Sequence, residues 1–145
     1  MKNYKIFLLM LIISFCIMYG VMFLNVASLD HLYLSLNRLY MALLMVSPMA
    51  ILMLILMRKM FKNKKLNAVI LVASLLVFII TVIFLREQIF IADKQYMQAM
   101  IPHHSSAILT SQEASIQNPE VKELADQIIE TQIREIELMK QYLQK

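Results

Sequence analysis

Three long apolar runs occupy most of the first 85 residues of the chain. They cover residues 6–25, 39–57 and 66–85 and consist almost wholly of Leu, Ile, Val, Met and Phe. A helix needs about 20 apolar residues to cross the hydrocarbon core of a bilayer. The first run is longer than a usual signal-peptide core and lacks a clear small-x-small cleavage site, which favours an uncleaved helix. The pattern therefore predicts three transmembrane helices.

The pattern changes after Arg86, where charged and amide side chains become frequent. Apolar positions recur at helical spacing from about Asp93 to Ala114. A second helix is expected to begin at Asn118-Pro119-Glu120, because Asn caps a helix, Pro suits its first turn and Glu favours its positive end. One apolar face of this second helix is expected to pack, formed by Val121, Leu124, Ala125, Ile128, Ile136, Met139 and Leu143.

These patterns predict an all-α fold with two domains. Residues 1–87 form the transmembrane region, and residues 88–145 form a helical domain outside it. Because two short helices bury little apolar surface, we expect the second domain to self-associate. A homodimer with four helices is the simplest arrangement, and packing against the membrane helices is the alternative.

Charge is distributed unevenly along the 145 residues, which carry a net charge of +4. Residues 1–92 hold nine basic and two acidic side chains, a net charge of +7, whereas residues 93–145 hold five basic and eight acidic ones, a net charge of −3. The positive charge thus belongs to the membrane region, so we expect lipid and not nucleic acid as a partner. A composition that is 60% hydrophobic with a single Gly agrees with a lipid environment.

The basic residues also predict the topology. Five of them fall within residues 58–65, and an excess of Lys and Arg marks the cytoplasmic side of a membrane. We expect an integral protein of the inner (cytoplasmic) membrane whose N-terminus and 58–65 loop are cytoplasmic. Three crossings then put residues 88–145 outside the cytoplasm, as in a periplasm. The same basic loop favours contact with anionic lipid.

The string from Met97 to His104, Met-Gln-Ala-Met-Ile-Pro-His-His, carries the candidate chemistry. On a helix, Met97, Met100 and His104 share one face, because offsets of three, four and seven return to the same side. His103 points about 100° away, so the adjacent histidines suit two sites or two chains better than one ion. Cys16 is the single cysteine, so no disulfide or Cys-x-x-Cys motif is present.

Thioether and imidazole donors together suit a soft or borderline ion, with Cu(I) as the leading candidate. Zinc would more often be held by Cys, or by His with carboxylates. The alternative is that the methionines are ordinary core residues and the histidines are hydrogen-bonded structural groups. An antiparallel hairpin that turns near residue 116 puts Met100 opposite about Gln132 and Met97 opposite about Ile136. Glu135 and Met139 then lie within a turn of the methionine pair.

Several of these residues resemble the domain of unknown function 305 family over about the last 55 residues. The resemblance rests on Asp93-Lys94-Gln95-Tyr96 followed by the string above, then Ala107-Ile108, then Gln132-x-x-Glu135-Ile136-x-x-Met139. The three membrane helices before it resemble a membrane-bound subgroup. Members are helical and similar to pieces of ferritin-like bundles, which implies a two-helix half-bundle here.

Some soluble extracytoplasmic relatives in this family are associated with copper binding and resistance. The resemblance therefore implies a metal site whose ligands are Met97, Met100, His103, His104 and Met139, with Glu135 and Gln132 as weaker members. The additional Met/His-rich segments of larger copper-binding relatives are absent from this sequence. High capacity for copper is accordingly not expected.

Two further patterns have alternative interpretations. Met41, Met45, Met49, Met53 and Met57 recur every four residues, which suits either a path for a soft cation or, more simply, packing between membrane helices. Asp30 and His31 lie in the loop between the first two apolar runs, where they can reach an ion held by the second domain. A solvated pair is the simpler interpretation of these two residues.

We therefore expect a membrane-anchored extracytoplasmic protein that binds copper for buffering or for handover to other metal-handling proteins. The alternative is a structural or adaptor protein without metal, whose 121–143 face binds a partner. We do not expect an enzyme. A ferritin-like oxidase would need inward carboxylates with a Glu-x-x-His spacing, which this sequence lacks, and no nucleophile-base pair or phosphate loop is evident.

Overall fold

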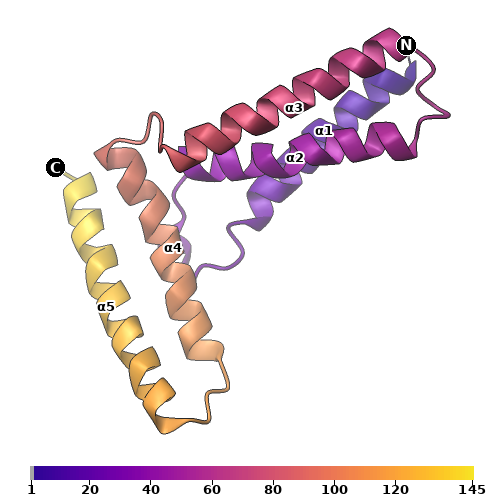
Figure 1. Ribbon diagram of the computed structural model, residues 1–145. Coiled ribbons are helices and arrows are strands. Elements are labelled where there is room, and N and C mark those ends of the chain that lie inside the picture. Colours follow the sequence, from indigo (N-terminus) through magenta and orange to yellow (C-terminus); the bar gives the residue numbers. More distant parts are fainter. Residues whose placement is uncertain (1) are drawn as a thin grey trace. The chain divides into compact units, whose positions relative to one another are not determined.

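A computed structural model describes residues 2–145 as an all-α chain, and no strand occurs in that range (Figure 1). The helices are α1 Lys2–Val21, α2 Leu36–Leu56, α3 Lys64–Arg86, α4 Asp93–Glu113 and α5 Pro119–Leu143, with a short 3-10 helix, η1, at Leu29–His31. They group into two compact units. The membrane unit contains the residues up to Val21 and Asn37–Phe90, and the hairpin unit contains Met22–Leu36 and Ile91–Lys145.

Helices α1, α2 and α3 are each long and apolar enough to cross a membrane. Their candidate spans are Asn3–Val21, Leu36–Leu56 and Lys64–Arg86, with mean hydropathy of 2.1, 2.4 and 3.2. The first helix ends at Val21 and not at Asn25, where the apolar run ends. Asn25 instead donates a hydrogen bond to the Ser106 hydroxyl of α4 at 2.9 Å, within the hairpin unit.

One end of the membrane unit is held by a cluster of aromatic rings. Phe61, in the loop between α2 and α3, is buried and contacts the rings of Phe7 and Tyr4, with centroids 5.3 and 5.2 Å away. The Tyr4 hydroxyl donates to Asn67 Oδ1 of α3 at 2.8 Å. Asn3 donates to the carbonyl of Met60 at 3.0 Å. The start of α1 and the basic 58–65 loop therefore lie at the same end of this unit.

The methionines of the row from Met41 to Met57, which begins in α2 and ends one residue after it, do not share one environment. Met53 and Met57 pack against the cluster formed by Phe7, Ala50, Leu54 and Phe61, whereas Met41 and Met45 are exposed. A repeat of four residues overshoots each helical turn by about 40°, so the row moves around the helix. This division agrees with the packing interpretation for Met53 and Met57.

Helices α4 and α5 form an antiparallel hairpin around a small apolar core (Figure 1). Ile101 and Ile108 of α4 meet Ile136 of α5, and all three are at most 3% exposed. The predicted start of α5 is confirmed, because the Asn118 side chain accepts a hydrogen bond from the Glu120 amide at 2.9 Å. Helix α4 ends at Glu113, one residue before the predicted end.

The apolar positions of α5 form two stripes and not one. Ala125 is buried, and Ile129, Ile136, Met139 and Leu143 belong to the hairpin core. Val121 and Leu124 do not belong to the hairpin core and are 47% and 54% exposed in the single chain. Together with Leu138 and Tyr142 they form an exposed stripe. A shift of one residue rotates a side chain by about 100° around a helix, so the two stripes lie side by side.

The 22–36 segment folds against α4, although it joins two membrane helices in sequence. The amide of Ala27 donates to the Ser105 hydroxyl at 2.8 Å, and the amide of Leu36 donates to Gln95 Oε1 at 2.9 Å. Tyr33 packs against the core of isoleucines. The loop between the first two spans is therefore a structural part of the hairpin unit.

Candidate functional site

His104 is fixed on α4 by a carboxylate of α5. Its Nε2 lies 2.8 Å from Glu135 Oε2, and the two side chains are 12% and 45% exposed. A carboxylate can only accept a hydrogen bond, so Nε2 carries the hydrogen and donates it. In the neutral imidazole, the lone pair available to other groups is then that of Nδ1.

Nδ1 of His104 is buried and has no hydrogen-bond partner within residues 2–145. A buried polar atom without a partner costs about 1–3 kcal/mol, so such atoms are few in folded proteins. A histidine that binds a metal usually donates its other ring N–H to a carboxylate, carbonyl or water. His104 has this arrangement, with Glu135 on one nitrogen and the other nitrogen unused.

Met97 and Met100 precede His104 by seven and four residues on α4, and both are half-buried. They share its helix face. The contact between His104 and Glu135 shows that these two residues lie at the same height along the hairpin. Because the two antiparallel helices rise equally per residue, Met100 then lies opposite about residue 139 and Met97 opposite about residue 142. The expected register, with Met100 opposite Gln132, is therefore wrong by about two turns. The pair His104–Glu135 is centred at about residue 119 to 120, which is the start of α5 and not the middle of the 114–118 connection, so the hairpin is not symmetric about residue 116.

Of the other expected ligands, Met139 and Gln132 lie on the inner side of α5, and His103 lies elsewhere. Met139 packs against the isoleucine core, and Gln132 is half-buried. His103 is exposed, and its ring centroid is 6.1 Å from that of His104 at an angle of 63° between the planes. His104 and Glu135 are in contact, the register that they set puts Met100 level with Met139 along the same seam, and His103 is exposed.

The donors along this seam are of few kinds. No group of three or more His, Cys, Asp or Glu side chains that could hold a metal ion occurs between Lys2 and Lys145. The expected donors nearest to His104 in the register of the hairpin are the thioether sulfurs of Met100 and Met139. Such a set fits a soft ion such as Cu(I) and does not fit the ligand sets typical of zinc.

His31 and Asp30 both contact the hairpin, and the interpretation as a solvated pair is wrong for His31, whereas the Asp30 side chain is 62% exposed. His31 Nδ1 lies 2.9 Å from the Ser105 hydroxyl, and its side chain is 15% exposed. Asp30 accepts a hydrogen bond from Lys140 of α5 and another from Ser28. Ser105 is 100° around α4 from His104, so this contact lies on a neighbouring face of the helix. Both residues have partners of their own and do not join the methionine face.

The pKa values of Asp30 and His31 are both lowered, which leaves one group charged and the other neutral. The hydrogen bond from Lys140, together with that from Ser28, lowers the pKa of Asp30 to about 2. Burial lowers the pKa of His31, and the positive charge of Lys140 lowers it further. The negative charge of Asp30 raises this pKa by a smaller amount. His31 is therefore neutral and Asp30 charged at neutral pH. Sequence reasoning missed Ser105, because a lone serine gives no signal of its long-range partners.

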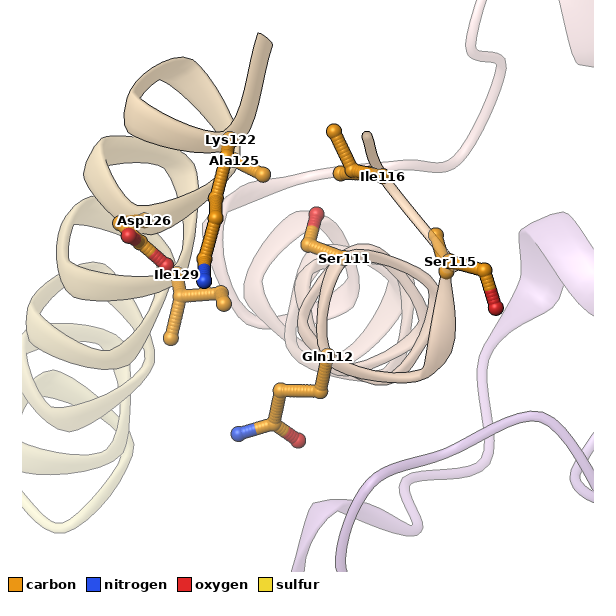
Figure 2. Close-up of a pocket in the computed structure, with 9 residues that line it drawn as sticks. Ser111, Gln112, Ser115, Ile116, Lys122, Ala125, Asp126 and Ile129 are labelled. Carbon is orange, nitrogen blue, oxygen red and sulfur yellow. The ribbon is translucent and has the colours of Figure 1, made fainter. Parts of the chain in front are cut away.

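A separate cavity lies at the turn of the hairpin, away from His104. It has a volume of about 400 Å³ and lies between Ser111 and Gln112 at the end of α4 and Lys122 and Asp126 at the start of α5 (Figure 2). Ser111 follows His104 by seven residues, or about two helical turns. None of the expected metal ligands lines this cavity.

Comparison with known proteins gives two findings for this chain. Residues 85–143, which include all of α4 and α5, match the domain of unknown function DUF305. The chain is also 40% identical over 144 residues to an uncharacterized protein of Acanthamoeba polyphaga mimivirus, covering 97% of this chain and 93% of the viral protein. No solved structure matches the chain. With its C-terminal hairpin matched by DUF305 and nearly its whole length matched by the viral relative, the chain belongs to the DUF305 family.

Proposed function

We propose that this chain is a membrane-anchored protein that binds a soft metal ion, copper in the first place, at His104. The observation that carries the proposal is the buried Nδ1 of His104, which has no partner among the described residues. Glu135 holds the opposite nitrogen at 2.8 Å and thereby fixes the tautomer and the orientation of the ring. Glu135 acts through His104 in this proposal and is not itself a ligand.

Thioether sulfur supplies the remaining donors. Met100 and Met97 lie on the same face of α4 as His104, and Met139 faces α4 from the other helix. Thioether and imidazole donors favour Cu(I) over magnesium or calcium, which prefer oxygen. Such a site binds and releases an ion, so we propose buffering, or handover to other metal-handling proteins, as its role and not catalysis.

The proposed location follows from charge. The start of α1 and the 58–65 loop lie at the same end of the membrane unit, and both are basic. An excess of Lys and Arg favours the cytoplasmic side. We therefore propose that three crossings of the inner (cytoplasmic) membrane carry α4 and α5 to the extracytoplasmic side.

A second candidate function is supported by the exposed stripe of α5. Val121, Leu124, Leu138 and Tyr142 are each about half exposed, at 47%, 54%, 48% and 52%. They form two exposed pairs toward the two ends of α5, since Leu124 and Leu138 are about 21 Å apart along the helix. Exposed apolar side chains of this kind in water favour contact with another protein. A homodimer would cover this stripe and complete four helices. The alternative is an adaptor that binds a different protein there and no metal.

Titration of the purified full chain with Cu(I), under reducing conditions and against a competing chelator, tests the proposal. We expect saturable binding that His104→Ala abolishes and Met100→Leu weakens, since leucine keeps the volume of methionine but not its sulfur. Glu135→Gln should weaken binding by about 10-fold to 100-fold, as for other groups that orient a liganding histidine.

Two variants serve as controls for this titration. His103→Ala removes the exposed histidine, and Met45→Leu removes an exposed methionine of α2. Both should bind copper as the natural chain does. Equal binding by His104→Ala would contradict the site, and failure of the folded natural chain to bind would favour the adaptor.

A further inference from the structure

A groove runs between α1, α2 and α3 in the membrane unit. Its volume is about 430 Å³, and nearly all of its lining is apolar. Small side chains keep it open, namely Ala50 of α2 and Ala73 and Ser74 of α3. Ser47, which also lines it, donates its hydroxyl hydrogen to the carbonyl of Leu43 within α2 and so offers no free donor.

The groove has the depth of one leaflet of a bilayer. On α3 its lining extends from Leu66 to Val77, and at 1.5 Å per residue this distance is about 16 Å. The hydrocarbon core of a bilayer is about 30 Å thick, so one leaflet contributes about 15 Å. The groove therefore extends from one membrane surface to near the centre of the bilayer.

Positive charge stands at the surface end of the groove. Lys5 directly follows the lining residue Tyr4, and Lys65 directly precedes the lining residue Leu66, so each lies at this end of the groove, at the edge of the helix face that lines it. Both lysines are exposed. Lysines near the end of a membrane helix extend their ammonium groups to the level of the lipid headgroups.

We propose that this groove binds one anionic phospholipid, with an acyl chain along Ala50 and Ala73 and its phosphate between Lys5 and Lys65. The length of the groove fits a chain of one leaflet, and its charged end fits an anionic headgroup. This inference depends on membrane insertion and does not depend on metal binding.

A second copy of the chain is the competing occupant, and charge argues against it. Copies inserted with the same topology have their basic ends at the same membrane surface. Helices of a second copy in the groove would bring its own Lys5 and 58–65 loop near those of the first. Like charges repel, whereas an anionic lipid supplies the opposite charge at that level.

The experiment is native mass spectrometry of the full chain after reconstitution into nanodiscs that hold equal amounts of phosphatidylglycerol and phosphatidylcholine. We expect one retained phosphatidylglycerol per chain, with a preference over phosphatidylcholine on the order of tenfold from two nearby lysines. Ala73→Phe fills the groove and should abolish retention of the lipid. The double variant Lys5→Gln with Lys65→Gln should retain lipid without the preference.

Matched controls separate the groove from general effects. Val72→Phe adds the same ring to an exposed position of α3 that does not line the groove, and it should retain phosphatidylglycerol. The double variant Arg58→Gln with Lys59→Gln removes the same charge at the end of α2 and should keep the preference. Equal retention of both lipids by the natural chain, or unchanged retention by Ala73→Phe, overturns the proposal. A lipid-free dimer that Ala73→Phe dissociates also overturns it and assigns the groove to a second copy.

Discussion

The two units of this chain both expose large apolar side chains, for different reasons. Leu75 of α3 is 50% exposed, and Leu124 of α5 is 54% exposed. In a bilayer, lipid tails are as apolar as leucine, so Leu75 needs no protein partner. In water, a stripe that includes Leu124 favours association. Whether an exposed apolar side chain favours a protein partner therefore depends on the solvent that surrounds its unit.

The units also differ in what holds their helices together. Phe61 and Tyr4 hold the membrane unit at its basic end through ring contacts and hydrogen bonds. In the hairpin unit, a core of isoleucines is supplemented by side-chain bonds to the 22–36 segment. We therefore expect equal substitutions to have unequal effects in the two units.

The largest effect is expected in the hairpin core. Ile136 is 2% exposed, so Ile136→Ala leaves a cavity and should destabilise the hairpin by about 2–5 kcal/mol. Hydrogen exchange of the α4 and α5 amides measures this loss. Ile133→Ala makes the same change at a position that is 43% exposed and should have little effect. Similar losses in both variants would mean that Ile133 also has a partner.

A charge at the two exposed leucines tests the comparison directly. Leu75→Lys places an ammonium group near the middle of α3 and should cost about 2.5–3.5 kcal/mol of insertion. Leu124→Lys should leave insertion and helix content unchanged, because its surroundings are aqueous. Glycosylation mapping of inserted chains gives the measurement. Normal insertion of Leu75→Lys would argue that α3 does not span the membrane.

A smaller effect is expected at the start of α5. The Asn118 side chain accepts from the Glu120 amide, so Asn118→Ala should destabilise the first turn by about 1 kcal/mol. Asn118→Asp keeps an acceptor and should restore the stability. Faster exchange of the amides of residues 120 and 121, confined to the alanine variant, is the expected result.

The smallest effect is expected from pH, because one half-buried group is responsible. His31 has a lowered pKa in the folded chain, so the folded form prefers neutral imidazole. Attachment of the 22–36 segment is therefore fully stable above the ordinary histidine pKa of 6.5 and weakens as pH falls below it. Asp30 stays charged in this window, since its pKa is about 2.

Exchange of the Ala27 amide, which donates to Ser105, is the measurement for this pH effect. It should accelerate as pH falls from about 7 to 5 beyond its intrinsic dependence on pH. His31→Gln cannot titrate and should remove the additional acceleration. Persistence of the acceleration in His31→Gln would assign it to another group.

Local patterns predicted most of the fold, because each depends on neighbours in sequence. The three apolar runs, the helix from Asp93 and the cap at Asn118 are of this kind. Long-range pairing was harder to predict. Equal rise about residue 116 put Met100 opposite Gln132, whereas the contact between His104 and Glu135 puts Met100 opposite about residue 139. The bonds from Asp30 to Lys140 and from His31 to Ser105 join residues 110 and 74 positions apart, and no sequence period links them.

The 22–36 segment has a consequence for protein engineering. The chain passes between its two units at three places, after Val21, after Leu36 and after Phe90. Residues 85–143 match a family domain, yet their Ser105 and Lys140 bind residues from a loop 74 or more positions earlier. A chimera that transplants this domain alone would leave those contacts behind. A portable version needs the 22–36 segment supplied in trans or fused through a new linker.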